Sequence, residues 1–177
     1  MTGSLLENFY SLYSRRRSIR TFETREIEEE KLIRLLEMLR NAQSAANCQP
    51  WHFVVLRGED KARFNEAFSR DGFKPAPQAI VACAEPAKAW SRKTDKKNYA
   101  WVDVTIAVTE MIGAATAEGI GTCWVAAFDE KLVTRLLALP DGIEPVGIIV
   151  MGYPVEPLER KDKTRKPLSE IIHHGKW

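Results

Sequence analysis

Four arginines surround a single serine in the segment RRRSIRTF, at residues 15–22. Guanidinium groups stay positively charged at any working pH and match phosphate geometry, and a serine hydroxyl can add one hydrogen bond to a phosphate oxygen. The segment could therefore hold a dianionic phosphate. By charge alone, however, the arginines are more simply explained as a solvated face, or as partners of the acidic segment at residues 26–30.

A second polar segment, AQSAANCQPWHF, spans residues 42–53. The side-chain amides of Asn47 and Gln49 offer both hydrogen-bond donors and acceptors, and the small residues before them allow another molecule to approach the backbone closely. Such a loop suits recognition of the edge of a flat heterocycle. The same residues fit a helix-to-strand connection in which Asn47 and Gln49 bond only to nearby backbone groups.

A second basic cluster lies far along the chain, in KDKTRKP, and contains Lys163, Arg165 and Lys166. It could converge with the first cluster on one anion, or it could be a charged and solvated tail.

The remaining reactive residue types suggest no nucleophile, and neither a catalytic residue nor a metal ligand is assigned. The three cysteines stand far apart without a CxxC pair: Cys48, Cys83 and Cys123. This spacing predicts neither a disulfide framework nor a zinc site, and it fits a reducing compartment. His52 begins an expected strand, and His173 and His174 lie near the carboxyl terminus, a pattern more typical of surface or partner contacts than of metal ligation.

Composition limits the classes of function. The 177 residues contain 26 basic and 24 acidic side chains, a balance that argues against a nucleic-acid-binding surface. The length suits one globular domain. We find no signal peptide and expect no segment that approaches the roughly 18 to 20 apolar residues of a membrane span. We therefore expect a cytoplasmic protein without a membrane partner.

Periodicity then indicates the elements that must position these segments. It predicts helices over residues 28–40, 60–70, 101–119 and 129–140, the last capped by Asp129. It predicts strands over residues 52–58, 78–86, 121–128 and 144–154. Residues 87–100 are expected to form an exposed loop or irregular lid, and residues 155–177 a tail that docks on something. Alternating strands and helices indicate an α+β or α/β class.

Four segments taken together resemble the nitroreductase-like flavoprotein family in order and spacing. They are RRSIRTF, AQSAANCQPWHFVV, GIGTCWVAAF and GYPVEPLERKDKTRKPLSEII. The resemblance covers roughly residues 13–172. It implies a single FMN-binding domain over residues 1–177 with an α+β fold: a mostly antiparallel central sheet flanked by helices. It also implies an obligate homodimer with one FMN in each of two clefts at the dimer interface.

The same resemblance implies roles for particular residues. The residues expected to meet the FMN phosphate, ribityl chain and pyrimidine edge are Arg16, Arg17, Ser18 and Arg20. Arg165, together with Lys163 or Lys166, is expected to grip the phosphate, and Asn47 and Gln49 to reach the flavin of the other subunit. The backbone expected to lie along the isoalloxazine and to hydrogen-bond N5 belongs to Trp124, Val125, Ala126 and Ala127.

The implied activity is FMN-dependent reduction of nitroaromatics, quinones or a similar electron-poor acceptor. NADH or NADPH would deliver hydride to N5 and leave before the acceptor takes its place, in a ping-pong cycle. A fixed cation near the N1 and O2 edge stabilises the charge that a flavin gains with hydride, and Arg20 is the candidate.

Other chemistry of the same fold stays open: reductive dehalogenation, azoline oxidation, consumption of the flavin, or a non-catalytic flavin carrier or redox sensor. The chain is short for the family, because residues 84–99 leave no room for the long helical insertion of many nitroreductases. The acceptor is therefore undetermined. The basic and aromatic residues of this loop either shape the cleft or belong to the surface: Trp90, Arg92, Lys93, Lys96 and Lys97.

Overall fold

A computed structural model describes residues 4–158 and 163–177 and is built around a four-stranded sheet. The strands are β1 (Trp51–Arg57), β2 (Gln78–Ala84), β3 (Gly121–Val125) and β4 (Glu144–Gly152). Their order is β1-β2-β4-β3, and all three pairings are antiparallel. The class is therefore α+β, as the family resemblance implied.

The two central strands explain why their sequences are almost continuously apolar. Every residue of β2 is buried, and all of β4 after Glu144 is buried too. Alternate residues face opposite layers: Ile80 packs with one core and Val81 with the other. Helices cover both faces of the sheet, so both faces of the central strands are mainly apolar, with Gln78 at the start of β2 as a buried polar exception.

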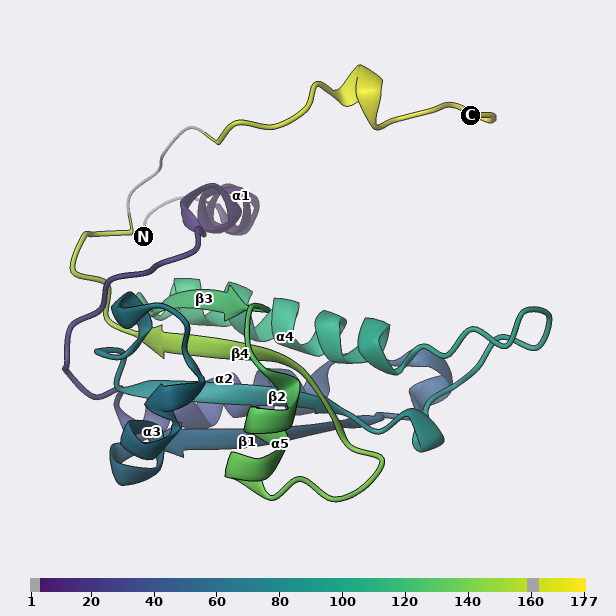
Figure 1. The fold of residues 1–177 in the computed structure, drawn as a ribbon. Helices are drawn as coiled ribbons and strands as arrows, with labels where there is room; N and C mark the ends of the chain where they lie inside the picture. The colour runs from purple at the N-terminus through teal and green to yellow at the C-terminus, as the bar shows by residue number, and fades with distance from the viewer. Residues whose placement is uncertain (1–3, 159–162) are drawn as a thin grey trace.

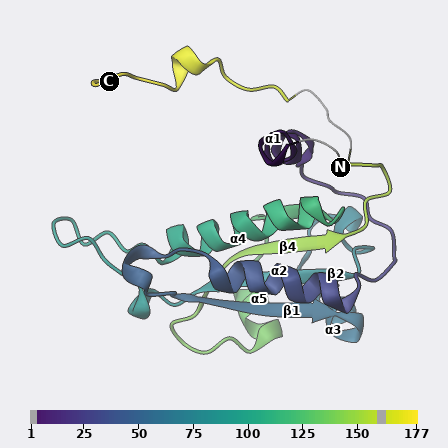
Figure 2. The ribbon, with the colours of Figure 1, turned by 180° about the vertical axis from the view of Figure 1, so that it is seen from behind.

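The helices form two layers (Figures 1 and 2). On one face, α2 (Glu29–Asn41) packs against α4 (Ala100–Ala117). On the other face lie α3 (Gly58–Phe64) and α5 (Glu130–Leu137). The Asp129 side chain caps α5 by accepting from the backbone N–H groups of Lys131 and Leu132, as the sequence predicts.

The apolar helix α4 corrects one expectation. It has the length and hydropathy that a membrane span needs, although the sequence argument found no such segment. Half of its 18-residue window is buried against the rest of the chain. Val104, Val108 and Met111 lie within the core beneath the sheet.

Two further helix predictions need correction. Helix α1 (Leu5–Arg15) was not predicted, although Ser4 and Glu7 form a capping box at its start. Its apolar residues recur at helical spacing (Leu5, Leu6, Phe9, Tyr10 and Tyr13), so a sequence signal was present, although none of these residues is buried in this chain. The helix expected over residues 60–70 ends at Phe64 and continues as a 3-10 turn, Asn65–Ala67. Phe68 then turns into extended backbone and joins an aromatic cluster with Phe64 and Phe73.

The carboxyl-terminal residues 163–177, here called the tail, extend away from the sheet and its helices (Figure 1). Their only helical turn is Leu168–Glu170, and Leu168, Ile171, Ile172 and Trp177 are exposed. Lys163 Nζ donates to the carbonyl of Tyr13 at 2.6 Å, at the end of α1. The sequence predicts a docked segment over residues 155–177. Its first part is docked, because Arg17 donates to the Pro157 carbonyl at 2.9 Å and Leu158 packs against the core, and Lys163 adds the contact with Tyr13.

Candidate functional site

Residues 16–22, here called the strap, lie beside β3 at the edge of the sheet. The Ile19 N–H donates to the Thr122 carbonyl at 2.9 Å, and Ser18 forms a bridge with Thr122. Ile19 and Phe22 are only 6% and 5% exposed, so two apolar side chains hold the strap down. A Cβ at Gly121 would lie 2.9 Å from Cγ1 of Ile19. Glycine at 121 therefore lets the strap approach β3 closely.

The strap directs its polar side chains outward. Ser18 and Arg20 are exposed on either side of the buried Ile19. Arg17 donates to the Pro157 carbonyl at 2.9 Å and lies 3.9 Å from Glu156, so it joins the strap to the segment that leads into the tail.

Arg20 lies at a small pocket of about 160 Å³. The other lining residues are Ser69, Arg70, Phe73, Cys123, Trp124, Val125, Ala126 and Ala127. The structure thus brings Arg20 together with the four residues after Cys123 that the sequence singled out. Ala126 and Ala127 lie beyond the last β3 ladder pair and are exposed, so a flat ligand could approach their backbone closely.

Sequence reasoning missed the contribution of residues 65–74 to this pocket. Ser69 and Arg70 line it, and a Cβ at Gly72 would lie 2.8 Å from the Arg20 carbonyl. The buried Lys61 fixes this loop: its Nζ donates to Asn65 Oδ1 at 2.6 Å and to the Phe73 carbonyl at 3.4 Å. The available signal was the polar pair Ser69 and Arg70, which stands a few residues before the apolar run at residues 78–84, but the placement of this pair depends on these long-range contacts.

The charge of the pocket is uncompensated. Neither Arg20 nor Arg70 makes a hydrogen bond or ion pair with another described residue. Burial raises the pKa of the Cys123 thiol, whereas the charges of Arg20 and Arg70, together with a hydrogen bond from Ser18, oppose that rise. Two guanidinium groups therefore act on one buried thiol, and the pocket favours an anionic or electron-rich group.

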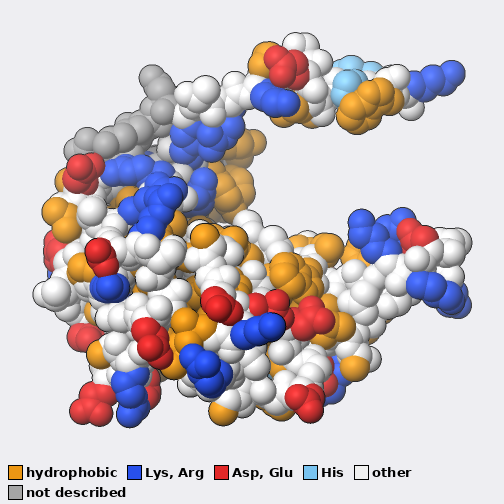
Figure 3. All heavy atoms as spheres, viewed as in Figure 1, with side chains coloured by type: hydrophobic (Ala, Val, Ile, Leu, Met, Phe, Trp, Pro, Cys, Tyr) orange, Lys and Arg blue, Asp and Glu red, His pale blue; other side chains and the backbone are white. Residues whose placement is uncertain are grey.

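A second group of cations lies where the end of α1, the strap and the tail meet (Figure 3). Burial lowers the pKa of the Lys163 ammonium, and the charges of Arg16 and Arg165 lower it further. Arg165 donates to the carbonyl of its neighbour Thr164 rather than to an acid. Cations from residues about 150 positions apart thus gather, and among residues 4–158 and 163–177 no carboxylate shifts the pKa of Lys163. This arrangement is typical of a phosphate site.

Asn47 and Gln49 belong to a different place, the loop at residues 44–49 before β1. Gln49 Nε2 donates to the carbonyl and to Oδ1 of Asn47, both at 3.2 Å. Ala46, Asn47 and Gln49 all have positive φ, at 51°, 55° and 50°. Three left-handed non-glycine residues within four positions are unusual and are found mostly at functional sites.

The structure does not bring this loop to the pocket within one chain. The loop precedes β1, whereas the strap lies beside β3, and β1 and β3 are the two outer strands of the sheet. Neighbouring strands are about 4.8 Å apart, so the outer strands are about 14 Å apart. We call the strap, pocket and tail cations the basic half, and the loop at residues 44–49 the amide half.

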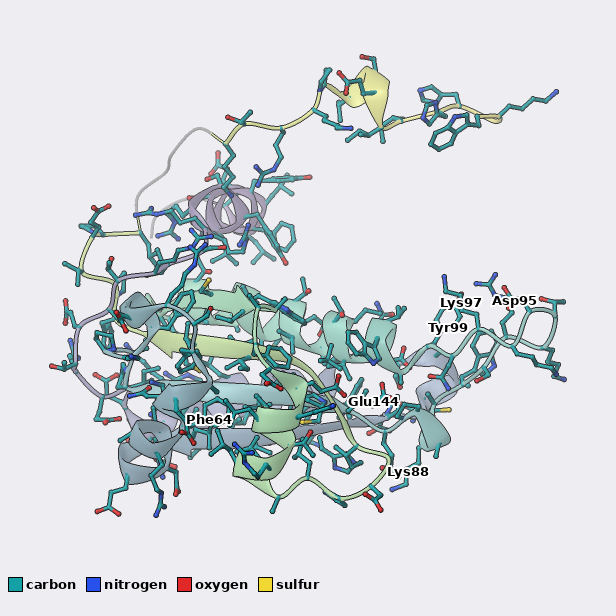
Figure 4. All side chains as sticks on the ribbon, viewed as in Figure 1. Phe64, Lys88, Asp95, Lys97, Tyr99 and Glu144 are labelled. Carbon is teal, nitrogen blue, oxygen red and sulfur yellow. The ribbon has the colours of Figure 1, made fainter. Side chains whose placement is uncertain are left out.

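The exposed loop at residues 86–99 projects from the end of the molecule that carries the amide half (Figure 4). Its expected exposure is confirmed, but it is more regular than predicted. Ser91 pairs with Asn98, and the ring of Trp90 meets that of Tyr99 edge-on with centroids 5.1 Å apart. Asn98 Nδ2 donates to the Pro86 carbonyl at 2.9 Å and closes the base of the loop.

Other reactive side chains form no competing site in the described parts of the chain. His52 Nε2 lies 2.8 Å from Glu85, which also pairs with Lys88. Burial raises the pKa of the Cys83 thiol to about 11, which keeps it protonated. Across residues 4–158 and 163–177, no three His, Cys, Asp or Glu side chains gather closely enough to hold a metal ion.

Comparison with known proteins agrees with this geometry. The model of the nitroreductase family matches residues 13–86 and 67–153. A putative NADH dehydrogenase/NAD(P)H nitroreductase of Archaeoglobus fulgidus is 32% identical over 97% of this chain and 100% of its own. A 5,6-dimethylbenzimidazole synthase of Rhodospirillum rubrum is 29% identical over 86% of this chain and 85% of its own.

Solved structures share the fold over nearly the whole chain. A nitroreductase family protein of Clostridium difficile 630 superposes with a TM-score of 0.86 at 33% identity, covering 94% of this chain and 98% of its own. An FMN-dependent nitroreductase of Clostridium difficile R20291 superposes with a TM-score of 0.77 at 25% identity, covering 95% and 99%.

Proposed function

The chain belongs to the nitroreductase family, and from that premise we propose that it is an FMN-dependent oxidoreductase that uses NADH or NADPH to reduce an electron-poor acceptor. The observation that carries the proposal is the convergence of Arg16 and Arg165 on Lys163, whose ammonium pKa their charges lower, with no acidic partner for these three cations among residues 4–158 and 163–177. This cluster adjoins the end of the strap that also carries Arg20 to the pocket.

The residues of the basic half fit FMN. Arg16, Arg165 and Lys163 would hold the phosphate, with Arg17 and Ser18 beside the ribityl chain. Arg20 would meet the pyrimidine edge, and the backbone of Trp124, Val125, Ala126 and Ala127 would lie along the ring system. The pocket's small and exposed Ala126 and Ala127 leave room for such a ring, and its two free guanidinium groups favour an electron-rich edge.

We also propose a homodimer in which Asn47 and Gln49 reach the flavin of the partner subunit. Two observations support it. The basic and amide halves lie at opposite edges of one sheet, and a second copy of the chain would bring an amide half to each basic half. Leu6, Phe9 and Tyr10 of α1 and Ile171 and Ile172 of the tail are exposed apolar residues that an interface would cover.

FMN, when bound, supplies the acceptance and delivery of hydride. The chain's own residues would bind the flavin, orient its ring and polarise it. The fixed charge of Arg20, with Arg70 beside it, would stabilise the negative charge that reduction brings, and the backbone of residues 124–127 would orient the reacting face. We assign no acid or base. We place the protein in the cytoplasm as one domain, a prediction that rests on the cysteine pattern and the family.

A second reaction of the same site is favoured by the names of relatives. The dimethylbenzimidazole synthase described above is one, and an iodotyrosine deiodinase of Thermotoga neapolitana is 23% identical over 94% of this chain and 97% of its own. Reductive dehalogenation or consumption of the flavin is therefore the alternative to nitro or quinone reduction. The loop at residues 86–99 is the region we expect to decide the acceptor.

The test begins with the absorption spectrum of the purified protein, before and after incubation with FMN. We expect a bound flavin that NADH or NADPH bleaches without oxygen, and that nitroaromatics, quinones or halogenated phenols reoxidise at different rates. A colourless protein that gains no flavin spectrum would refute the proposal. A flavin that neither nicotinamide reduces would instead indicate a carrier, or another electron donor.

A further inference from the structure

Asp103 is a buried carboxylate in the first turn of α4. Its side chain is 1% exposed, and Oδ1 accepts the backbone N–H of Ala45 at 3.0 Å. Oδ2 is buried without a hydrogen-bond partner among the described residues. Burying a charged group is costly, so its retention calls for an explanation. The amino-terminal end of α4 reduces that cost, because the helix dipole favours negative charge there.

Ala45 opens the 3-10 turn Ala45–Asn47, which forms the centre of the amide half. Ala46, Asn47 and Gln49 are held in left-handed backbone conformations that residues with a Cβ rarely adopt. Such a conformation persists only when the surrounding contacts over-determine it. The loop must therefore be fastened at several points.

Most of these fastenings come from the loop itself. The Asn47 N–H donates to the Ser44 carbonyl at 3.0 Å, and the Gln49 N–H donates to Ser44 Oγ at 3.0 Å. The Asp103 carboxylate is different, because it joins the loop to a helix 58 residues away in sequence.

We propose that Asp103 is a positioning residue for the cofactor site. Its carboxylate fixes the amide half to α4, so that Asn47 and Gln49 present their amides in one geometry to the flavin of the partner subunit. This inference rests on the proposed function, because the role of Asn47 and Gln49 at the flavin belongs to that proposal. Asp103 itself touches neither the flavin nor the substrate.

The experiment compares Asp103→Ala and Asp103→Asn with Thr116→Val as the matched control. Thr116 is also buried in α4, at 4% exposure, and its Oγ1 donates to the Ile112 carbonyl at 3.0 Å, within its own helix. Each variant is made in the wild-type chain and in an Asn47→Ala/Gln49→Ala background. The readouts are the FMN dissociation constant, the visible circular dichroism of the bound flavin, and the melting temperature.

We expect Asp103→Ala to weaken FMN binding about tenfold and to change the circular dichroism of the bound flavin. Asp103→Asn should weaken FMN binding about threefold and change the circular dichroism as well. Thr116→Val should lower only the melting temperature. In the Asn47→Ala/Gln49→Ala background, the effect of Asp103→Ala on FMN affinity should fall below about twofold, because the groups it positions are absent. If Asp103→Ala gives no folded protein, the FMN affinities of Asp103→Asn in the same two backgrounds test the inference instead.

Equal loss of FMN affinity in both backgrounds, or unchanged affinity in the Asp103 variants, would overturn the inference. If Asn47→Ala/Gln49→Ala itself binds FMN like wild type, Asp103 has nothing to position and this inference fails, while the proposed oxidoreductase stands. If the wild-type protein binds no FMN, the proposed function fails and this inference fails with it.

Discussion

The basic half and the amide half differ in how the chain builds them. The basic half gathers cations from the strap, the tail and the loop at residues 65–74, and it leaves Arg20, Arg70 and Arg16 without an acidic partner among the described residues. The amide half is one neutral loop of six residues whose hydrogen bonds are mostly internal. Three of its residues adopt left-handed backbone conformations that are energetically unfavourable. One half is specified by charge brought from far along the chain, and the other by local backbone geometry.

This difference predicts different sensitivities. Charge attracts at a distance and is weakened by salt, whereas amide hydrogen bonds depend on placement and respond little to salt. Substitutions in the basic half should therefore change affinity for the phosphate group strongly. Those in the amide half should change geometry at the ring.

The largest effect should come from Arg16→Ala combined with Arg165→Ala. Each charge-assisted hydrogen bond contributes about 1.5–3 kcal/mol, so FMN affinity should fall roughly 100-fold or more. Riboflavin, which lacks the phosphate, is the control ligand and should bind the variant and the wild type alike. Titrations monitored by flavin fluorescence at two salt concentrations measure both. A parallel loss of riboflavin affinity would contradict a phosphate role.

A smaller effect should follow Arg20→Ala. We expect FMN affinity to fall roughly tenfold and the midpoint potential of the bound flavin to fall by about 20–40 mV, because a cation near the ring stabilises the reduced form. Lys131→Ala, which removes an exposed cation on α5, is the matched control. Potentiometric titration with a reference dye checks the shift, and an unchanged potential would remove Arg20 from the pyrimidine edge.

The smallest effect concerns Lys61, which holds the pocket loop of the basic half. Burial lowers its pKa to about 8, below the ordinary value of 10.5. Between these values the unfolded chain binds more protons than the folded one, so this group makes the protein more stable as pH rises through 8. The slope is up to about 1.4 kcal/mol per pH unit. Urea unfolding between pH 7 and 9.5 should show this rise in the wild type and its absence in Lys61→Met. Equal slopes would contradict it.

Much of the fold could be predicted because its signals are local. The apolar run of β2 and the cap at Asp129 are both properties of neighbouring residues, and the structure confirms both elements. Helix α1 also had local signals, a capping box and apolar residues at helical spacing, which the sequence prediction overlooked. Residues 60–70 do not form the single helix that their periodicity predicts, because Phe68 leaves the helical conformation and packs against Phe64.

The residues of the candidate site also divide into those that a local sequence pattern indicates and those that only long-range contacts place. The strap and the tail cations were recognisable from the sequence because charge clusters are visible in it, and the structure places Arg16, Lys163 and Arg165 together. Arg70 was missed because its place depends on the buried Lys61 and on the close approach of Gly72 to Arg20. The family resemblance alone suggested that Asn47 and Gln49 act on another subunit, since no local pattern indicates it.

The position of β1 and β3 at opposite edges of one sheet has a consequence for how the protein behaves at low concentration. If each flavin needs one edge from each of two chains, cofactor binding and chain association are linked equilibria, and each strengthens the other by the same factor. Dilution should then release flavin, and specific activity should fall with protein concentration and recover when FMN is added in excess. The cell's flavin supply would in this way set how much of the chain is assembled.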